Sequence, residues 1–183
     1  MRRILILKGV CKNLKIGIIS DSHDNRDNIL KTVSIINERK LDMLIHCGDY
    51  VAPFVKRWFD KLDDSIKKNF YGVFGNNDGE RLFLKKNLGQ ICQFTENSNE
   101  LILECEGKRI FATHMLKPAT IEALANSGNF DIILYGHTHQ LQQKKMDNGV
   151  LILNPGEICG YLTGNSTFGI INTNKMDIEI ISL

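Results

Sequence analysis

The stretch KIGIISDSH, residues 15–23, contains the pattern that decides the fold of the first half of the chain. KIGIIS is a short run rich in β-branched residues and predicts a buried strand, and the polar triplet DSH follows directly at its end. Apolar residues then recur at helical spacing from Ile29 to Ile36, which predicts a helix over Asn25–Arg39. A buried strand, a polar loop and a helix therefore follow one another as one unit.

The same unit recurs twice more along the chain. MLIHC at 43–47 and FYGVF at 70–74 predict strands, and Pro53–Leu62 and Glu80–Asn87 predict the helices that follow them. This alternation is typical of a mostly parallel sheet with helices on its faces.

The second half is richer in paired strands. Residues 101–113, 142–153 and 167–182 each read as two strands joined by a turn, and the second pair has an Asn-Gly turn. A helix is expected over Pro118–Asn126 and a buried strand over Asp131–Tyr135. The pairs predict a second, mixed sheet packed against the first.

The composition bounds the class of protein. With 183 residues, 43% hydrophobic and 24% charged, the chain is globular and not disordered, and no apolar run approaches the ~20 residues of a membrane span. Because no repeat, linker or low-complexity stretch interrupts it, residues 15–183 are expected to form one domain. Residues 1–14 are expected to be a disordered N-terminal extension.

Charge and cysteine content narrow the partners and the compartment. Residues 1–15 carry five basic side chains and no acid, which leaves 18 basic against 21 acidic residues in the remainder, a net charge of −3. Such a body does not indicate a surface that coats nucleic acid. The five cysteines are odd in number and form no CxxC, which argues against a disulfide framework and a thiolate zinc site. Reduced, mostly buried cysteines in the cytoplasm are expected.

Five polar clusters each follow a predicted strand directly: Asp21-Ser22-His23, Gly48-Asp49, Gly75-Asn76-Asn77-Asp78, His114, and Gly136-His137-Thr138-His139. The carboxyl ends of neighbouring strands meet in one crevice, so these side chains are expected to converge. The remaining histidine, His46, lies inside a strand and is expected to be a satisfied core residue and not a ligand.

Two aspartates, four histidines and one asparagine of these clusters are candidate ligands, which are too many for one tetrahedral ion but suit two ions that share a carboxylate. Imidazole and carboxylate without thiolate suit Mn, Fe, Ni, Co or Zn. Two divalent ions and two aspartates leave a charge of +2, which a bridging hydroxide and an anionic phosphate ester would balance. Such a pair lowers the pKa of bound water and holds attacking and leaving oxygens. The alternative is that these residues only cap helices and close turns, which five separate strand-end placements disfavour.

DSH, GD, GNND, a single TH and GHTH, in that order, resemble the calcineurin-like metallophosphoesterase superfamily. The motifs GNNDGER (75–81), YGHTH (135–139) and NPGE (154–157) look most like its small prokaryotic metallophosphodiesterases. The resemblance extends over residues 15–183. It implies an α/β fold, a four-layer αββα sandwich of two packed mixed sheets flanked by helices.

The resemblance also implies roles for individual residues. The ligands of one metal would be Asp21, His23, Asp49 and His139. The ligands of the second would be Asp49, Asn76, His114 and His137, with Asp49 bridging. A hydroxide between the ions would attack phosphorus directly, without a covalent intermediate. Asp78 and Thr138 are predicted to orient ligand imidazoles, Asn77 and Asp78 to assist catalysis, and Asn77 and Arg81 to contact substrate.

Two departures from the pattern of the superfamily affect the expected activity. Many members have a histidine after the motif asparagine, where it protonates the leaving group, but this chain has Asn77, whose amide donates a hydrogen bond and no proton. We therefore expect weak dependence on an acid catalyst and a preference for good leaving groups. After His114, the chain has Met115-Leu116 where the family often has Gly-His, which changes the local shape of the substrate pocket.

The leading prediction is an enzyme, a divalent-metal-dependent phosphodiesterase, with two transition-metal ions per chain, Mn or Ni ahead of Fe, Co and Zn. A phosphomonoesterase on the same site is the nearest alternative, but such enzymes usually add arginines, and Arg81 is the only one near the motifs. A protein-binding scaffold is another, because the retromer scaffold subunit has this fold. A small phosphodiester is the expected substrate, with no membrane partner. Nucleic acid is not favoured as a partner. The resemblance permits homo-oligomers.

Overall fold

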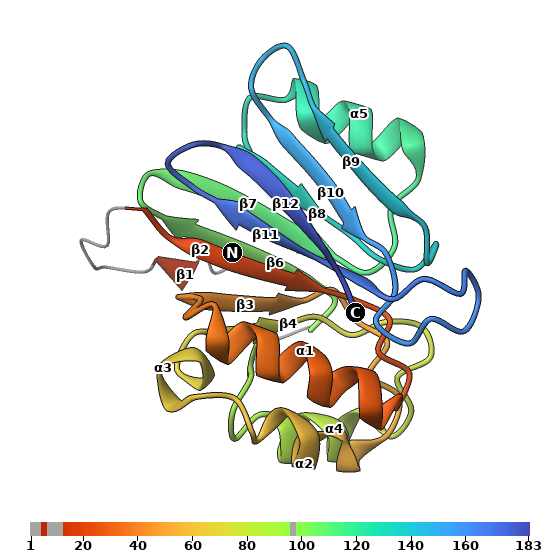
Figure 1. The fold of residues 1–183 in the computed structure, drawn as a ribbon. Coiled ribbons are helices and arrows are strands. Elements are labelled where there is room, and N and C mark those ends of the chain that lie inside the picture. The colour runs from red at the N-terminus through yellow and green to blue at the C-terminus, as the bar shows by residue number, and fades with distance from the viewer. Residues whose placement is uncertain (1–4, 7–12, 96–97) are drawn as a thin grey trace.

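The computed structural model describes residues 5–6, 13–95 and 98–183. Two six-stranded sheets are stacked within these ranges (Figure 1). The strands of the first sheet are, in spatial order, β12 (Asp177–Ser182), β11 (Thr167–Asn172), β2 (Lys15–Ile19), β3 (Met43–His46), β4 (Phe70–Gly72) and β5 (Gln93–Phe94). The strands of the second sheet are β1 (Leu5–Ile6), β6 (Glu100–Cys105), β7 (Lys108–Thr113), β8 (Ile132–Leu134), β10 (Leu151–Pro155) and β9 (Leu141–Lys145).

Both sheets are mixed, as predicted. The strands β2, β3, β4 and β5 run parallel, and β11 and β12 add an antiparallel pair beside β2. In the second sheet β7, β8 and β10 run parallel, while β6 and β9 run antiparallel to their neighbours β7 and β10. Most of the predicted N-terminal extension lies outside the described residues, but Leu5–Ile6 pair in parallel with β6.

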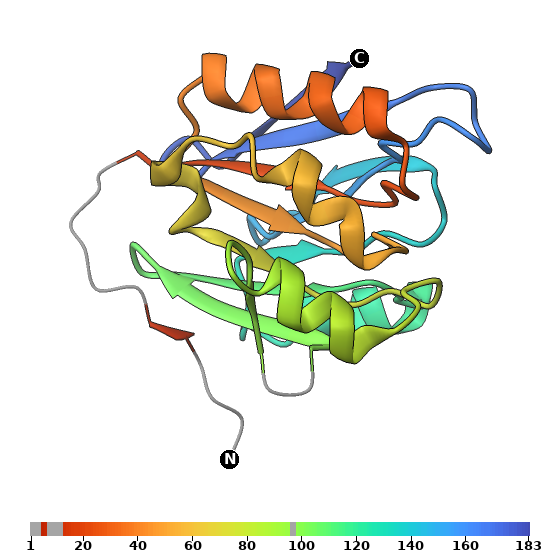
Figure 2. The ribbon, with the colours of Figure 1, turned by 90° about the horizontal axis from the view of Figure 1, so that it is seen from below.

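The helices of the described ranges cover the two outer faces. They are α1 (Arg26–Glu38), the 3₁₀ turn η1 (Pro53–Val55), α2 (Lys56–Phe59), α3 (Asp64–Lys67), α4 (Arg81–Leu88) and α5 (Pro118–Asn126). The helices α1 to α4 lie on the first sheet, α1 beside α2 and α4 beside η1, and Figure 2 looks onto this face. The helix α5 lies on the second sheet (Figure 1). None of them is long and apolar enough to cross a bilayer.

Three apolar layers hold the sandwich together, and alternation along single strands fills them. On β2, Ile18 belongs to the core between the sheets and Ile19 to the core beneath α1. On β8, Ile132 again faces the other sheet, while Ile133 packs with Ala125 of α5. Every one of these side chains is buried, so both faces of each central strand are covered and its sequence reads as a continuous apolar run. The four-layer αββα sandwich is confirmed.

Two sequence-based expectations on the elements were wrong in detail. The predicted helix over Pro53–Leu62 is a 3₁₀ turn followed by the one-turn helix α2, which ends at Phe59, and the short helix α3 was not predicted. The hairpin over 167–182 joins the first sheet through β11 and β2, although it comes last in the chain. Such a pairing depends on partners more than a hundred residues away, which the local pattern does not contain.

The loops that carry the polar clusters lie at one end of both sheets (Figure 1). Within the first sheet, the N–H of Asp21 donates to the carbonyl of Gly48 at 3.0 Å. Across the two sheets, the N–H of His137 donates to Oδ2 of Asp21 at 3.1 Å. The sandwich thus brings strand ends from two sheets to one place.

Candidate metal centre

The seven predicted ligands come together at this end of the sandwich. They come from the loops after five strands: Asp21 and His23 after β2, Asp49 after β3, Asn76 after β4, His114 after β7, and His137 and His139 after β8. The first sheet supplies four of them and the second sheet three. The convergence expected of strand ends is therefore present in the structure.

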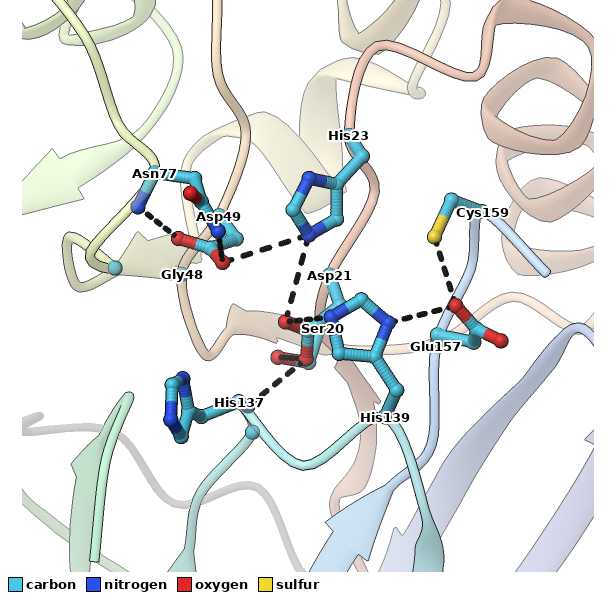
Figure 3. Close-up of polar contacts among 12 residues, drawn as sticks. Ser20, Asp21, His23, Gly48, Asp49, Asn77, His137, His139, Glu157 and Cys159 are labelled. Atoms are coloured by element: carbon cyan, nitrogen blue, oxygen red, sulfur yellow. Dashed lines mark hydrogen bonds and ion pairs between the residues drawn. The ribbon is translucent and has the colours of Figure 1, made fainter. Parts of the chain in front are cut away.

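One group of four surrounds the end of β2. One ligand atom from each of Asp21, His23, Asp49 and His139 lies within 4.8 Å of the others (Figure 3). Nε2 of His139 is 3.4 Å from Oδ1 of Asp21, and Nε2 of His23 is 3.4 Å from Oδ2 of Asp49. Two carboxylates and two imidazoles at this spacing form a donor set suited to a transition-metal ion.

A second group lies on the other side of Asp49. Nε2 of His114 is 3.3 Å from Oδ2 of Asp49 and 3.0 Å from Oδ1 of Asn76. Nδ1 of His137 is 2.8 Å from the same Asn76 oxygen. Because Oδ2 of Asp49 faces both His23 and His114, this carboxylate lies between the two groups.

Two buried polar atoms of the first group have no hydrogen-bond partner in the described part of the chain. Among the described residues, Oδ1 of Asp21 and Nε2 of His23 are buried side-chain atoms without a hydrogen-bond partner. A buried polar atom without a partner is costly, and a cation between these two atoms would remove that cost. The residues present therefore fit a divalent metal ion.

Protonation in the metal-free protein agrees with this. The carboxylates of Asp21 and then Asp49 outweigh burial and raise the pKa of His23 to about 9, so a proton takes the place of a cation. Burial raises the pKa of Asp49, but the facing imidazoles of His114 and His23, at 3.3 and 3.4 Å, outweigh it and hold the pKa well below its usual range. Asp49 therefore stays ionised.

The backbone at the ligands is bent to aim the side chains inward. Five of the seven ligands have positive φ: 51° at Asp21, 39° at His23, 61° at Asp49, 69° at His137 and 59° at His139. This left-handed region disfavours side chains, and residues held there tend to gather at functional sites.

Close approach of the loops requires glycine at two positions. A Cβ on Gly75 would lie 2.0 Å from Oδ1 of Asp49, and one on Gly136 would lie 1.9 Å from Oγ of Ser20. The glycines of the GNND and GHTH motifs thus let neighbouring loops reach the ligands.

His46 is a satisfied core residue, as predicted. It is fully buried, its Nδ1 accepts the N–H of Gly48 at 3.1 Å, and its Nε2 is 3.0 Å from Oγ of Ser22. Burial lowers the pKa of His46 well below its usual value, so the ring is neutral. It links the two loops that carry Asp21 and Asp49.

Asp78 has a different task from the predicted orientation of imidazoles. Its buried carboxylate accepts four backbone N–H groups, those of Asp49, Tyr50, Val51 and Gly75, at 2.6–3.2 Å. Burial raises the pKa of Asp78 even so. Asp78 joins the GNND loop to the backbone that carries Asp49.

Thr138 also departs from that prediction. Its hydroxyl accepts hydrogen bonds from Nδ2 of Asn154 and the N–H of Gln140. Thr138 therefore ties its loop to β10 and contacts no ligand ring through these bonds.

The predicted substrate contacts divide between Asn77 and Arg81. Asn77 is exposed, and its amide and its backbone N–H donate to the carboxylate of Asp49. The guanidinium of Arg81 donates to the carbonyls of Gly75 at 2.6 Å and Asp78 at 3.4 Å. Arg81 thus holds its own loop, whereas Asn77 lies on the open side of the centre.

Glu157 is the residue that the sequence analysis missed. It is fully buried, and its Oε2 is 2.7 Å from Nδ1 of His139 (Figure 3). The sequence does carry one signal for Glu157, because this residue follows the strand β10 just as the other polar clusters follow their strands. The motif NPGE, which contains it, contributes only to the family resemblance.

Comparisons with known proteins identify the family. The model of the family described as the calcineurin-like phosphoesterase superfamily domain matches residues 14–176. Phosphodiesterase MJ0936 of Methanocaldococcus jannaschii is 40% identical over 170 residues, which are 93% of this chain and 99% of that protein. A probable metallophosphoesterase of Bacillus subtilis, YsnB, is 26% identical over 79% of this chain and 75% of its own.

Solved structures show the same fold. One described as a novel archaeal phosphodiesterase has a TM-score of 0.83 and 39% identity, and the match covers 93% of this chain and all of that one. Vps29 of Chaetomium thermophilum has a TM-score of 0.64 at 15% identity, over 93% of this chain and 97% of its own, which shows the fold alone. The chain belongs to the calcineurin-like phosphoesterase superfamily.

Proposed function

We propose that the protein is a divalent-metal-dependent phosphodiesterase. The observation that carries the proposal is the position of Asp49, whose Oδ2 is 3.4 Å from Nε2 of His23 in one group and 3.3 Å from Nε2 of His114 in the other. A carboxylate between two groups of imidazole donors suits two ions. The names of the 40% identical relative and of the structure at TM-score 0.83, both phosphodiesterases, support the same activity.

Each ion would be held by one of the groups described above. Asp21, His23, Asp49 and His139 would hold the first, and Asp49, Asn76, His114 and His137 the second. Manganese or nickel is proposed ahead of iron, cobalt or zinc, because the donors are imidazole, carboxylate and amide. When bound, the ions supply a hydroxide nucleophile at neutral pH and the positive charge that holds attacking and leaving oxygens.

Asn77 is the residue we assign to the substrate. Its amide is on the open side of Asp49, where it would donate a hydrogen bond to a phosphoryl or leaving-group oxygen. An amide has no useful pKa and gives up no proton. The rate is therefore expected to depend strongly on the stability of the leaving group.

A diester is favoured over a monoester by the position of Arg81. A phosphate monoester is a dianion for much of the neutral range, and arginine is the side chain best suited to grip it. In this protein the guanidinium of Arg81 is bonded to the carbonyl of Gly75 and lies 5.6 Å from the ring centre of Phe74. A single-charged diester needs less of that help.

The ligand set also disfavours a scaffold without catalysis. A binding scaffold is expected to lose metal ligands, whereas all seven positions here have side chains able to bind a metal. The cysteines Cys47, Cys92, Cys105 and Cys159 are free and buried, which supports the proposal of a reducing, cytoplasmic setting. The proposed substrate is a small phosphodiester, and homo-oligomers remain compatible with the fold.

Hydrolysis of bis-p-nitrophenyl phosphate against p-nitrophenyl phosphate tests the proposal. Chelator-stripped protein is assayed after separate addition of Mn, Ni, Co, Zn or Mg, with Asp49→Asn as the inactive variant and the exposed Asp27→Asn as its matched control. We expect that added metal restores diester hydrolysis in the wild type and in Asp27→Asn, and that Asp49→Asn stays inactive. Faster monoester hydrolysis would favour a phosphatase, and no turnover despite bound metal would favour the scaffold.

A further inference from the structure

The carboxylate of Glu157 accepts hydrogen bonds from the ring of His139 and from the segment 159–163. Oε2 accepts from Nδ1 of His139 at 2.7 Å, from the thiol of Cys159 at 2.9 Å and from the N–H of Tyr161 at 3.1 Å. Oε1 accepts the N–H and the hydroxyl of Thr163 at 2.6 and 2.7 Å. The N–H of Leu162 lies between the two oxygens, at 3.1 and 3.3 Å.

These donors surround a carboxylate that is fully buried, and both of its oxygens are engaged. A buried anion with all its lone pairs engaged is a rigid anchor for the groups that surround it.

The first group that it anchors is the ring of His139. Because Nδ1 lies 2.7 Å from the carboxylate of Glu157 and donates to it, Nε2 is the nitrogen left to bind a metal. Nε2 is the atom that faces Oδ1 of Asp21 at 3.4 Å. A carboxylate behind a histidine in this way fixes its tautomer and raises its strength as a metal ligand.

The second group is the segment 159–163. Three successive backbone N–H groups of this segment point at the one carboxylate, while the side chains of Tyr161 and Leu162 are 63% and 73% exposed. The segment also rests on the centre, since the N–H of Cys159 donates to the carbonyl of Asp21 at 3.1 Å. The carboxylate of Glu157, which contacts His139, thus also holds the backbone of the segment 159–163, whose apolar side chains are exposed.

We propose that Glu157 is a positioning residue that couples metal binding by His139 to the order of the segment 159–163. One carboxylate holds both, so a change that weakens it loosens the loop and lowers metal affinity together. The metal half of this inference rests on the proposed function, because it requires His139 to be a ligand. The loop half does not, because the hydrogen bonds are present without metal.

Glu157→Gln is the sharpest variant because it keeps the shape of the side chain. Each carboxylate oxygen accepts from at least two donors, so the amide nitrogen of a glutamine faces N–H donors whichever way it turns. Thr163→Val is the milder second variant, because it removes one donor from Oε1 and leaves His139 untouched. Glu122→Gln, at an exposed position of α5, is the matched control for the loss of one negative charge.

The test combines Mn²⁺ affinity, by titration calorimetry, with hydrogen exchange of residues 159–163 in chelator-treated protein. For Glu157→Gln we expect Mn²⁺ affinity about 10- to 100-fold below wild type and faster exchange of the three amides. Thr163→Val is expected to show smaller changes in the same two quantities, and Glu122→Gln neither. Near-ultraviolet circular dichroism checks that each variant is folded.

Two results would overturn the coupling. One is full Mn²⁺ affinity in Glu157→Gln or Thr163→Val although the loop amides exchange faster. The other is reduced affinity with unchanged exchange. If folded wild-type protein itself bound no Mn²⁺ or other divalent ion, the proposed function and the metal half of this inference would both fail, and loop exchange in Glu157→Gln would still decide the other half.

Discussion

Asn77 donates both its backbone N–H and its side-chain amide to the carboxylate of Asp49, each at 2.8 Å. The two bonds end on different oxygens, so one residue spans the carboxylate that lies between the two donor groups. An exposed residue of the GNND loop is thus hydrogen-bonded to the carboxylate that both donor groups share.

Replacement of Asn77 separates hydrogen bonding from proton donation. Asn77→Ala is expected to lower kcat/KM about three- to tenfold, the value of one hydrogen bond of ~1 kcal/mol, since no proton donor is lost. Asn77→His is expected to speed the hydrolysis of diesters with poor leaving groups, toward the ~10²-fold of a general acid. A series of aryl diesters of increasing leaving-group pKa measures both effects. A steep loss in Asn77→Ala, without gain in Asn77→His, would contradict the assignment.

Asp78→Asn is expected to destabilise the protein without altering any ligand. The amide nitrogen of the new side chain must face two of the four backbone N–H groups that Asp78 now accepts. Loss of these buried hydrogen bonds is expected to lower the free energy of unfolding by about 2–4 kcal/mol. Urea denaturation of chelator-treated protein measures this, with Asp27→Asn as the control. A change under ~1 kcal/mol would show that the loops hold without this carboxylate.

Metal removal is expected to lower the melting temperature. A ligand at 100 times its Kd stabilises a fold by about 2.7 kcal/mol, which is about 5–10 °C for a chain of this size. Thermal unfolding of chelator-stripped protein, to which increasing amounts of Mn²⁺ are added back, measures the shift in melting temperature. Asp49→Asn should show little or none of it, and an equal shift in that variant would place the bound ions elsewhere.

Metal binding is expected to release a proton from His23. With a pKa of about 9 the ring is protonated at pH 7.5, and it must lose that proton to act as a ligand. Affinity should therefore rise with pH up to about 9. Calorimetry in buffers of different ionisation enthalpy counts the protons, with His23→Asn as the comparison. Binding that released no proton at pH 7.5 would exclude His23 as the group displaced.

The same raised pKa has an opposite effect on the metal-free fold. The pKa of His23 is higher in the folded protein than its ordinary value of 6.5, so the stabilisation that it provides is fully present below pH 6.5. It is lost as the pH rises through about 9. Urea denaturation of chelated wild type and His23→Asn at pH 6 and pH 9.5 measures it, and equal losses in the two proteins would contradict it.

Sequence reasoning predicted that the seven proposed ligands lie together, because their positions follow from strand ends. Apolar runs mark β2, β3, β4, β7 and β8, and the polar residues after each run must meet at one edge. The partners of Asp78 at residues 49–51 could not be predicted in this way, since only the folded chain brings that loop near. Arg81 binds carbonyls of its own loop, which the pattern of strand ends does not specify. The place of β11 beside β2 was hidden for the same reason.

Glu157 shows a different kind of gap. Glu157 follows a strand as the other clusters do, but nothing in the sequence shows that it lies buried behind a histidine and not at the surface. Its burial and its partners appear only once β10 lies beside β8. A residue that supports a proposed ligand from behind is therefore harder to predict from the sequence than the ligand itself.

The division of the ligands between the two sheets has a consequence for folding. Asp21, His23, Asp49 and Asn76 belong to one sheet, and His114, His137 and His139 belong to the other. Under the proposed function, a bound cation would cross-link layers whose residues are far apart in the chain, much as a disulfide would. The full set of donors comes together only when the two sheets are docked, so binding of metal would report that the sandwich has closed.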